Sequence, residues 1–187
     1  MPYAKADFIP FPSDAGQVIA YLEASYEQWH QARQSLAMLP SSMFWQSKEG
    51  TDYLKLSRPA PVDTPADKVE VIEFFWYGCP HCYELEPTLK KWLARKPDDV
   101  TFKRVPAIFR QSWVAGAQTF YTLETLGELD RMHSMVFDAI HMERQAFNDM
   151  ATISSWMGKN GIDAKKFEDT AKSFAVSGKV QRAQQMS

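Results

Sequence analysis

The spacing of hydrophobic residues changes along the chain, and over residues 14–39 it is helical. Apolar and aromatic side chains recur there every three or four positions, at Ile19, Leu22, Tyr26, Trp29 and Leu36. Asp14 and Gln17 stand three residues apart, as in a capping box, and Pro40 ends the pattern. The pattern predicts one long amphipathic helix in the head of the chain.

Residues 48–112 alternate between strand and helix patterns. Short apolar runs predict strands over 51–56, 68–77 and 98–109. The second run, KVEVIEFFWY, is nearly continuous in apolar and aromatic residues, which is typical of a strand covered on both faces. Residues 83–96 carry Leu85, Leu89 and Trp92 on one side of a predicted helix. Strand, helix, strand is the crossover unit of an α/β domain.

From residue 113 to the end the pattern is helical, and we expect no strand after Phe109. Apolar side chains form one stripe at Leu129, Met132, Val136 and Ile140. Capping residues predict that further helices start at Asn148 and at Asp163. The chain therefore divides into a head (1–47), a β-α-β part (48–112) and a helical part (113–187).

Composition and charge narrow the functions that the chain can have. Of the 187 residues, 45% are hydrophobic, which is enough for a folded core. Lysine and arginine total 21 against 23 acidic residues, so no excess of positive charge indicates a nucleic acid or an anionic membrane as partner. We expect no transmembrane span, and residues 1–17 lack the pattern of a secretory signal.

The chain has two cysteines, Cys79 and Cys82, and they lie three positions apart. Two cysteines placed at random have this spacing roughly once in a hundred times, so a shared chemical role is the better explanation than two inert, buried thiols. The pattern puts Cys79 just before a helix and Cys82 in its first turn, where unpaired backbone N–H groups and the helix dipole stabilise a Cys79 thiolate. Pro80 suits a helix start, and His81 adds a polar neighbour that is cationic when protonated.

The stretch FFWYGCPHC, preceded by Glu73, resembles the active-site strand and motif of DsbA-type thiol:disulfide oxidoreductases of the thioredoxin superfamily. The resemblance covers about residues 50–185. It implies a thioredoxin-like α/β fold with an inserted helical domain, to which this chain adds an N-terminal helical extension. It also implies an enzyme that introduces disulfide bonds into substrate proteins by dithiol-disulfide exchange.

The resemblance gives each residue of the motif a role. Cys79 would be the nucleophile that forms mixed disulfides and Cys82 the buried resolving cysteine, while Pro80 and His81 would tune the redox poise. Glu73 matches the family's buried acid, with Lys103 on the next strand as its expected cationic partner. A Glu73 at a solvent-facing edge is the alternative.

The partners and the compartment also follow from the resemblance. It implies reduced or unfolded substrate proteins, reoxidation by a DsbB-type membrane quinone reductase, a periplasmic location, and no cofactor beyond the Cys79–Cys82 disulfide. Without a signal in this chain, a cytoplasmic location is the alternative.

Two departures from the family pattern lead to further expectations. No proline follows Pro106, so we expect the fold to lack the family's cis-proline loop and last strands, and to be marginally stable with an open sheet edge. Residues 1–47 do not resemble the family, which predicts a head of foreign origin.

Two other functions remain open from the sequence alone. One is a zinc module that uses Cys79, Cys82 and two of the four histidines, which are His30, His81, His133 and His141. The spacing argues against it because a second close-spaced ligand pair is missing, and we expect no metal. The other is an inactive fragment that acts only as an interaction module.

Overall fold

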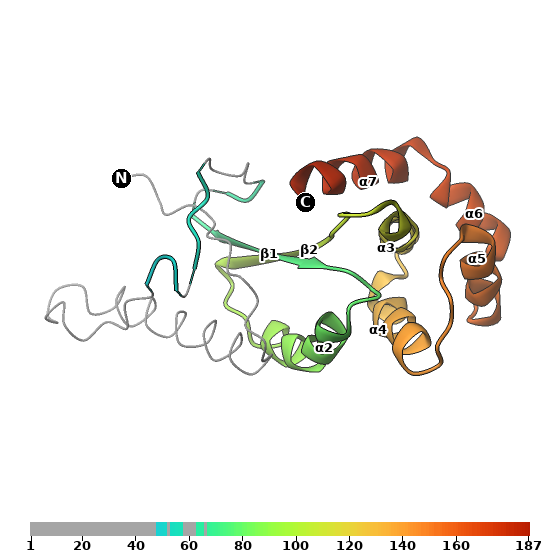
Figure 1. Cartoon of the computed structure of the whole chain (residues 1–187), viewed down its shortest axis with the longest axis horizontal. Coiled ribbons are helices and arrows are strands. Elements are labelled where there is room, and N and C mark those ends of the chain that lie inside the picture. Colours follow the sequence, from blue (N-terminus) through green and yellow to red (C-terminus); the bar gives the residue numbers. More distant parts are fainter. Residues whose placement is uncertain (1–47, 52, 58–62, 66) are drawn as a thin grey trace, which may run out of the picture. The chain divides into compact units, whose positions relative to one another are not determined.

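The computed structural model describes residues 48–51, 53–57, 63–65 and 67–187 (Figure 1). In chain order its elements are β1 (Val69–Phe75), α2 (Pro80–Leu93), β2 (Val100–Pro106), the 3-10 helix η2 (Gln111–Trp113), α3 (Val114–Leu126), α4 (Leu129–His141), α5 (Met150–Lys159), α6 (Ala164–Ala171) and α7 (Phe174–Met186). The helix predicted over residues 14–39 lies outside the described residues. After β2 every named element is helical, as the sequence predicted.

The chain forms two compact units that do not coincide with the predicted domains. In their described residues, one unit contains parts of 48–71 together with 87–101, and the other contains 72–86 together with 102–187. The elements β1, α2 and β2 contribute to both units. The division of the chain into residues 1–47, 48–112 and 113–187 stays a prediction.

In the first unit, the strand predicted over residues 51–56 is wrong for the residues that the structure describes. They form an isolated parallel bridge between Glu49 and Tyr53 in place of a strand. Gly50 has a φ of +82°, and its N–H donates to the carbonyl of Tyr53 at 2.8 Å. The turn at residues 50 and 51 therefore takes in the first residue of the predicted strand.

The strands β1 and β2 pair in parallel, as a strand-helix-strand unit requires. The N–H of Val69 donates to the carbonyl of Asp99 at one end, and the N–H of Ala107 donates to the carbonyl of Phe75 at the other, each at 2.8 Å. Both strands therefore run in the same direction from these points. The described residues form a sheet of these two strands, in the order β1-β2.

The helix α2 buries the side that the sequence predicted and ends at Leu93, three residues earlier than expected. Leu85, Leu89 and Trp92 are each at most 5% exposed. Pro87 lies inside the helix and has no N–H, so it removes one helical hydrogen bond after the first two turns.

The second unit has α3 at its centre. This helix contacts η2, α4, α5, α6 and α7 (Figure 1). The apolar core of the second unit contains Phe75, Phe120, Leu123, Met132, Val136, Phe137, Ile153, Met157 and Phe167. In the stripe predicted on α4, Met132 and Val136 are fully buried, while Leu129 and Ile140 are half-buried. None of the helices in the described part of the chain is long and apolar enough to cross a bilayer.

One of the two predicted helix starts is correct. The carboxylate of Asp163 accepts from the N–H of Lys166 at 2.7 Å and caps α6. The predicted cap at Asn148 is wrong, because the next residue, Asp149, has the extended backbone of a cap and accepts from the N–H of Thr152 at 2.8 Å.

Candidate active site

The two cysteines lie at the start of α2, as predicted, and differ in exposure. Cys79 immediately precedes the helix, and its carbonyl accepts from the N–H of Tyr83 at 3.1 Å. Both thiols are free; Cys79 is half-buried, whereas Cys82 is 7% exposed. Burial raises the pKa of the Cys82 thiol to about 12, and its interactions with Cys79 and the charge of Glu73 act in the same direction. A nucleophile from another molecule therefore meets Cys79 first.

The dipeptide between the cysteines lies at the surface. Pro80 is exposed and is the first residue of α2. The side chain of His81 is 73% exposed, and its Nδ1 lies 3.6 Å from a carboxylate oxygen of Glu84. These side chains can meet a docking partner, and their tuning of the redox poise stays a prediction.

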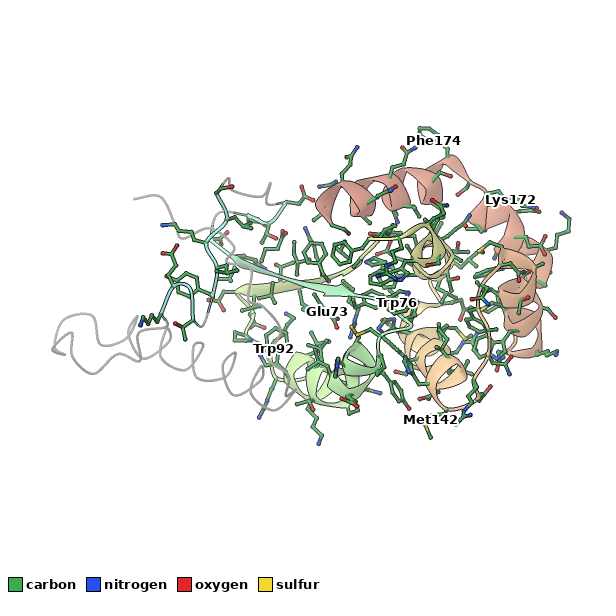
Figure 2. All side chains as sticks on the ribbon, in the orientation of Figure 1. Glu73, Trp76, Trp92, Met142, Lys172 and Phe174 are labelled. Atoms are coloured by element: carbon green, nitrogen blue, oxygen red, sulfur yellow. The ribbon has the colours of Figure 1, made fainter. Side chains whose placement is uncertain are left out.

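An aromatic pair adjoins the cysteines in the second unit. Trp76 stacks on Trp113 with ring centroids 4.2 Å apart and an angle of 8° between the planes. A Cβ at Gly78 would lie 2.3 Å from the Trp76 ring, so the glycine leaves room for it. Figure 2 shows Trp76 just beyond β1, close to the start of α2. The hydrophobic spacing of the chain does not predict this pair.

Glu73 is the buried acid that the sequence predicted, but its partner is different. It lies on β1 and is 8% exposed (Figure 2). Its Oε2 accepts from Nε of Arg104 at 3.0 Å, while its Oε1 is buried and has no hydrogen-bond partner among the described residues. Burial raises the pKa of Glu73 to about 7, against the attraction of Arg104 and with the help of the Glu86 charge.

The expected contact between Glu73 and Lys103 is therefore wrong. Successive side chains of a strand point to opposite faces of the sheet, so Lys103 and Arg104 cannot both face Glu73. The structure places Arg104 on that face. Any influence of Lys103 on the redox poise stays a prediction.

Three further side chains extend this ion pair into a buried network. Nη2 of Arg104 lies 3.2 Å from both carboxylate oxygens of Glu86. One of these oxygens, Oε1 of Glu86, also lies 3.2 Å from Nε2 of His133. Nδ1 of His133 lies 2.8 Å from the hydroxyl of Tyr77. Glu86, His133 and Tyr77 are all less than 9% exposed. A largely buried charged network has strong effects on the protonation of its members.

The two central groups of this network have displaced pKa values. Burial acts to raise the pKa of Glu86, but the hydrogen bond and charge of His133, together with Arg104, outweigh it and lower that pKa. Burial also lowers the pKa of His133, although Glu86 opposes this effect. The lowered pKa values favour an ionised Glu86 and a neutral His133 at neutral pH; in that state Nε2 donates to the carboxylate and Nδ1 accepts from the Tyr77 hydroxyl.

The sequence held a partial signal for this network. Glu86 follows Cys82 by four positions and therefore shares the buried face of α2. His133 follows Leu129 by four positions on the apolar stripe of α4. A buried polar residue needs a hydrogen-bond partner, so a polar residue on an apolar stripe is recognisable in the sequence as part of such a pair. The sequence does not show which residue its partner is.

Two histidines of the zinc hypothesis, His133 and His141, have hydrogen-bond partners away from the cysteines. Both ring nitrogens of His133 have partners, and Nε2 of His141 lies 2.8 Å from the carbonyl of Tyr77. His30 lies outside the described residues. Within the described ranges, no group of three or more histidine, cysteine or acidic side chains could hold a metal ion.

Comparison with known proteins gives the family. No protein-family model matches the chain. The thiol:disulfide interchange protein DsbA of Pseudomonas syringae pv. tomato is 39% identical over 153 residues, which are 78% of this chain and 71% of that protein. The chain belongs to the DsbA family. The DsbA of Pseudomonas aeruginosa is 42% identical over 137 residues, which are 73% of this chain and 64% of that protein, so the chain spans less than two thirds of this relative.

A solved DsbA structure agrees with this assignment. The crystal structure of Pseudomonas aeruginosa DsbA matches with a TM-score of 0.67 and 41% identity, over 71% of this chain and 69% of that one. The predicted fold class, thioredoxin-like with a helical insertion, is therefore confirmed for this DsbA family member.

Proposed function

We propose that this DsbA family member is a thiol:disulfide oxidoreductase that introduces disulfide bonds into substrate proteins through Cys79 and Cys82. The observation that supports this most directly is the difference between the two thiols: Cys79 is accessible at the start of α2, and Cys82 is buried one turn inside. One sulfur can then react with another protein while the other completes the exchange.

The proposed reaction starts from the Cys79–Cys82 disulfide. A substrate thiolate attacks Sγ of Cys79, the bond between the two cysteines breaks, and Cys82 leaves as a thiolate that takes up a proton. The second substrate thiolate attacks the substrate sulfur of the mixed disulfide, and Cys79 leaves. The substrate loses two electrons and two protons and gains a disulfide, and the enzyme gains two thiols.

Glu73 has the properties of a proton donor for the leaving Cys82. Its charge acts on Cys82, and a carboxyl with a pKa of about 7 holds a proton in a substantial fraction of molecules at neutral pH. In this proposal, Pro80 and His81 adjust the redox poise from the exposed side of the pair.

The finer assignments rest on the family. They are reduced or unfolded proteins as substrates, a DsbB-type membrane quinone reductase as the oxidant that restores the disulfide, and the bacterial periplasm as the compartment. In the same family pattern, residues 48–112 supply the thioredoxin-like part, residues 113–187 the inserted helical domain, and residues 1–47 a separate head.

A stoichiometric transfer experiment tests the proposal. The oxidised 187-residue chain is mixed with a reduced peptide that contains two cysteines, and peptide disulfide and chain thiols are measured together. We expect one peptide disulfide for every two chain thiols formed, and no transfer from the Cys79→Ser variant. A folded chain that leaves the peptide reduced would favour the alternative of a non-catalytic interaction module.

A further inference from the structure

We propose that His133 is a positioning residue that determines which of two buried carboxyls, Glu73 or Glu86, holds a shared proton. This inference rests on the proposed function, because it concerns the proton that Cys82 needs when it leaves the disulfide. It assigns a role to a side chain from the helical segment, far in sequence from the CPHC motif.

The buried network holds two carboxyl groups beside one guanidinium. Arg104 is a single cation in contact with both carboxyl groups, through Nε to Glu73 and through Nη2 to Glu86. Its side chain is only 18% exposed, and those of Glu73 and Glu86 are 6% and 11% exposed. Two ionised carboxylates beside one guanidinium leave a net negative charge in a desolvated place. Retaining one proton on the pair removes that charge.

The two carboxyl groups have unequal hydrogen-bond partners. Glu86 is held by Nη2 of Arg104 at both oxygens and by Nε2 of His133 at one of them. Glu73 has Nε of Arg104 on one oxygen, and its other oxygen is buried without a hydrogen-bond partner in the described part of the chain. Hydrogen-bond donors stabilise the ionised form, so Glu86 keeps the charge and Glu73 takes the proton.

The imidazole of His133 has a partner at each ring nitrogen, which fixes its orientation. An ionised Glu86 can only accept, so Nε2 of a neutral His133 carries the ring proton and donates to it at 3.2 Å, and Nδ1 then accepts from the Tyr77 hydroxyl at 2.8 Å. Aromatic rings pack around it, with centroid distances of 5.2 Å to Phe75 and to Phe137. The His133 donor therefore has one direction, and it adds to the contact that Nη2 of Arg104 already makes with Glu86.

The His133 donor affects Cys82 through the protonation state of Glu73. With the His133 donor in place, Glu73 carries the proton and is neutral, so the negative charge that would raise the pKa of Cys82 is absent. Without the donor, the proton shifts toward Glu86, and an ionised Glu73 opposes the formation of a thiolate at Cys82. Interacting carboxyls titrate as a pair, so both must be followed in the test.

The experiment follows carboxyl titration in the full, reduced chain by NMR, with glutamate labelled with carbon-13 at the carboxyl and with Glu73→Gln and Glu86→Gln to assign the two signals. We compare His133→Gln, which keeps a donor at the place of Nε2, with His133→Asn, whose amide lies at the place of Nδ1. Phe137→Leu is the packing control, because it changes a ring beside His133 but no polar group. Circular dichroism checks that each variant is folded.

We expect the Glu73 titration to move down by about one pH unit in His133→Asn and to stay in place in His133→Gln and Phe137→Leu. The pH profile of peptide-disulfide formation should move with it. An unchanged Glu73 titration in folded His133→Asn, or an equal shift in His133→Gln, would overturn the proposal. Because the titration needs no substrate, an inactive chain would contradict the proposed function and leave this test decisive.

Discussion

The buried carboxyl of Glu73 should make the stability of this protein decrease between pH 4.5 and pH 7. Its pKa is raised from the ordinary value of 4.5 to about 7, with burial as the main cause. In that interval the folded state holds more protons at this site than the unfolded state does. The stabilisation is fully present below pH 4.5, declines as the pH rises, and is lost above pH 7.

The size of the effect follows from the two pKa values. Each pH unit of difference corresponds to about 1.4 kcal/mol, so the interval from 4.5 to about 7 corresponds to about 3 kcal/mol. Glu73 is 8% exposed, so solvent screening reduces this value little. A glutamine at this position cannot ionise, and Glu73→Gln should therefore gain up to about 3 kcal/mol relative to the parent chain between pH 4.5 and pH 8.

Urea unfolding followed by circular dichroism at several pH values measures this difference. Subtracting the curves of Glu73→Gln and the parent chain cancels the titration of groups that do not interact with Glu73, and any constant cost of the new amide does not change with pH. Glu84→Gln is the matched control, because it removes a carboxylate on α2 that is 67% exposed. A difference between Glu73→Gln and the parent chain that stays the same from pH 4.5 to pH 8 would refute a raised pKa at Glu73.

Three other predictions concern charge, reactivity and capping. Glu86, whose pKa is lowered, stabilises the fold above its ordinary value of 4.5, so the stability lost in Glu86→Gln at pH 7 should diminish as the pH falls below that value, again by urea unfolding. Alkylation of the reduced chain at mildly acidic pH, read by peptide mass, should modify Cys79 before Cys82, and the reverse order would contradict their assignment. Asp163→Ala should cost about 1 kcal/mol by loss of the α6 cap, while Asp163→Asn keeps most of it; equal losses would show that the cap is unimportant.

Much of the fold near the cysteines could be predicted because local patterns determine it. The apolar run that precedes Cys79 forms a strand, and the helical spacing of Leu85, Leu89 and Trp92 identifies the buried side of α2. An acid within the apolar run is expected to be buried, and Glu73 is. These inferences need only the spacing at which side chains return to the same face of a helix or of a strand.

The partners in the buried network could not be predicted, because they depend on contacts across long stretches of chain. Lys103 and Arg104 are adjacent cations on a strand with apolar residues on both faces, so the sequence does not show which of them faces Glu73. The contact of Glu86 with His133 joins residues 47 positions apart on different helices. Such a contact follows from how the helices pack, which the hydrophobic spacing of each helix does not specify.

The most direct test of the central claim is to locate the first bond that the protein forms with a substrate. The chain carrying the Cys79–Cys82 disulfide is mixed with a peptide that has a single cysteine, quenched with acid at early times, digested and mapped by mass spectrometry. The exposure of the two sulfurs predicts that the peptide is attached to Cys79 while Cys82 is a free thiol. Attachment mainly at Cys82, or no mixed disulfide at all from a folded and oxidised chain, would contradict the account.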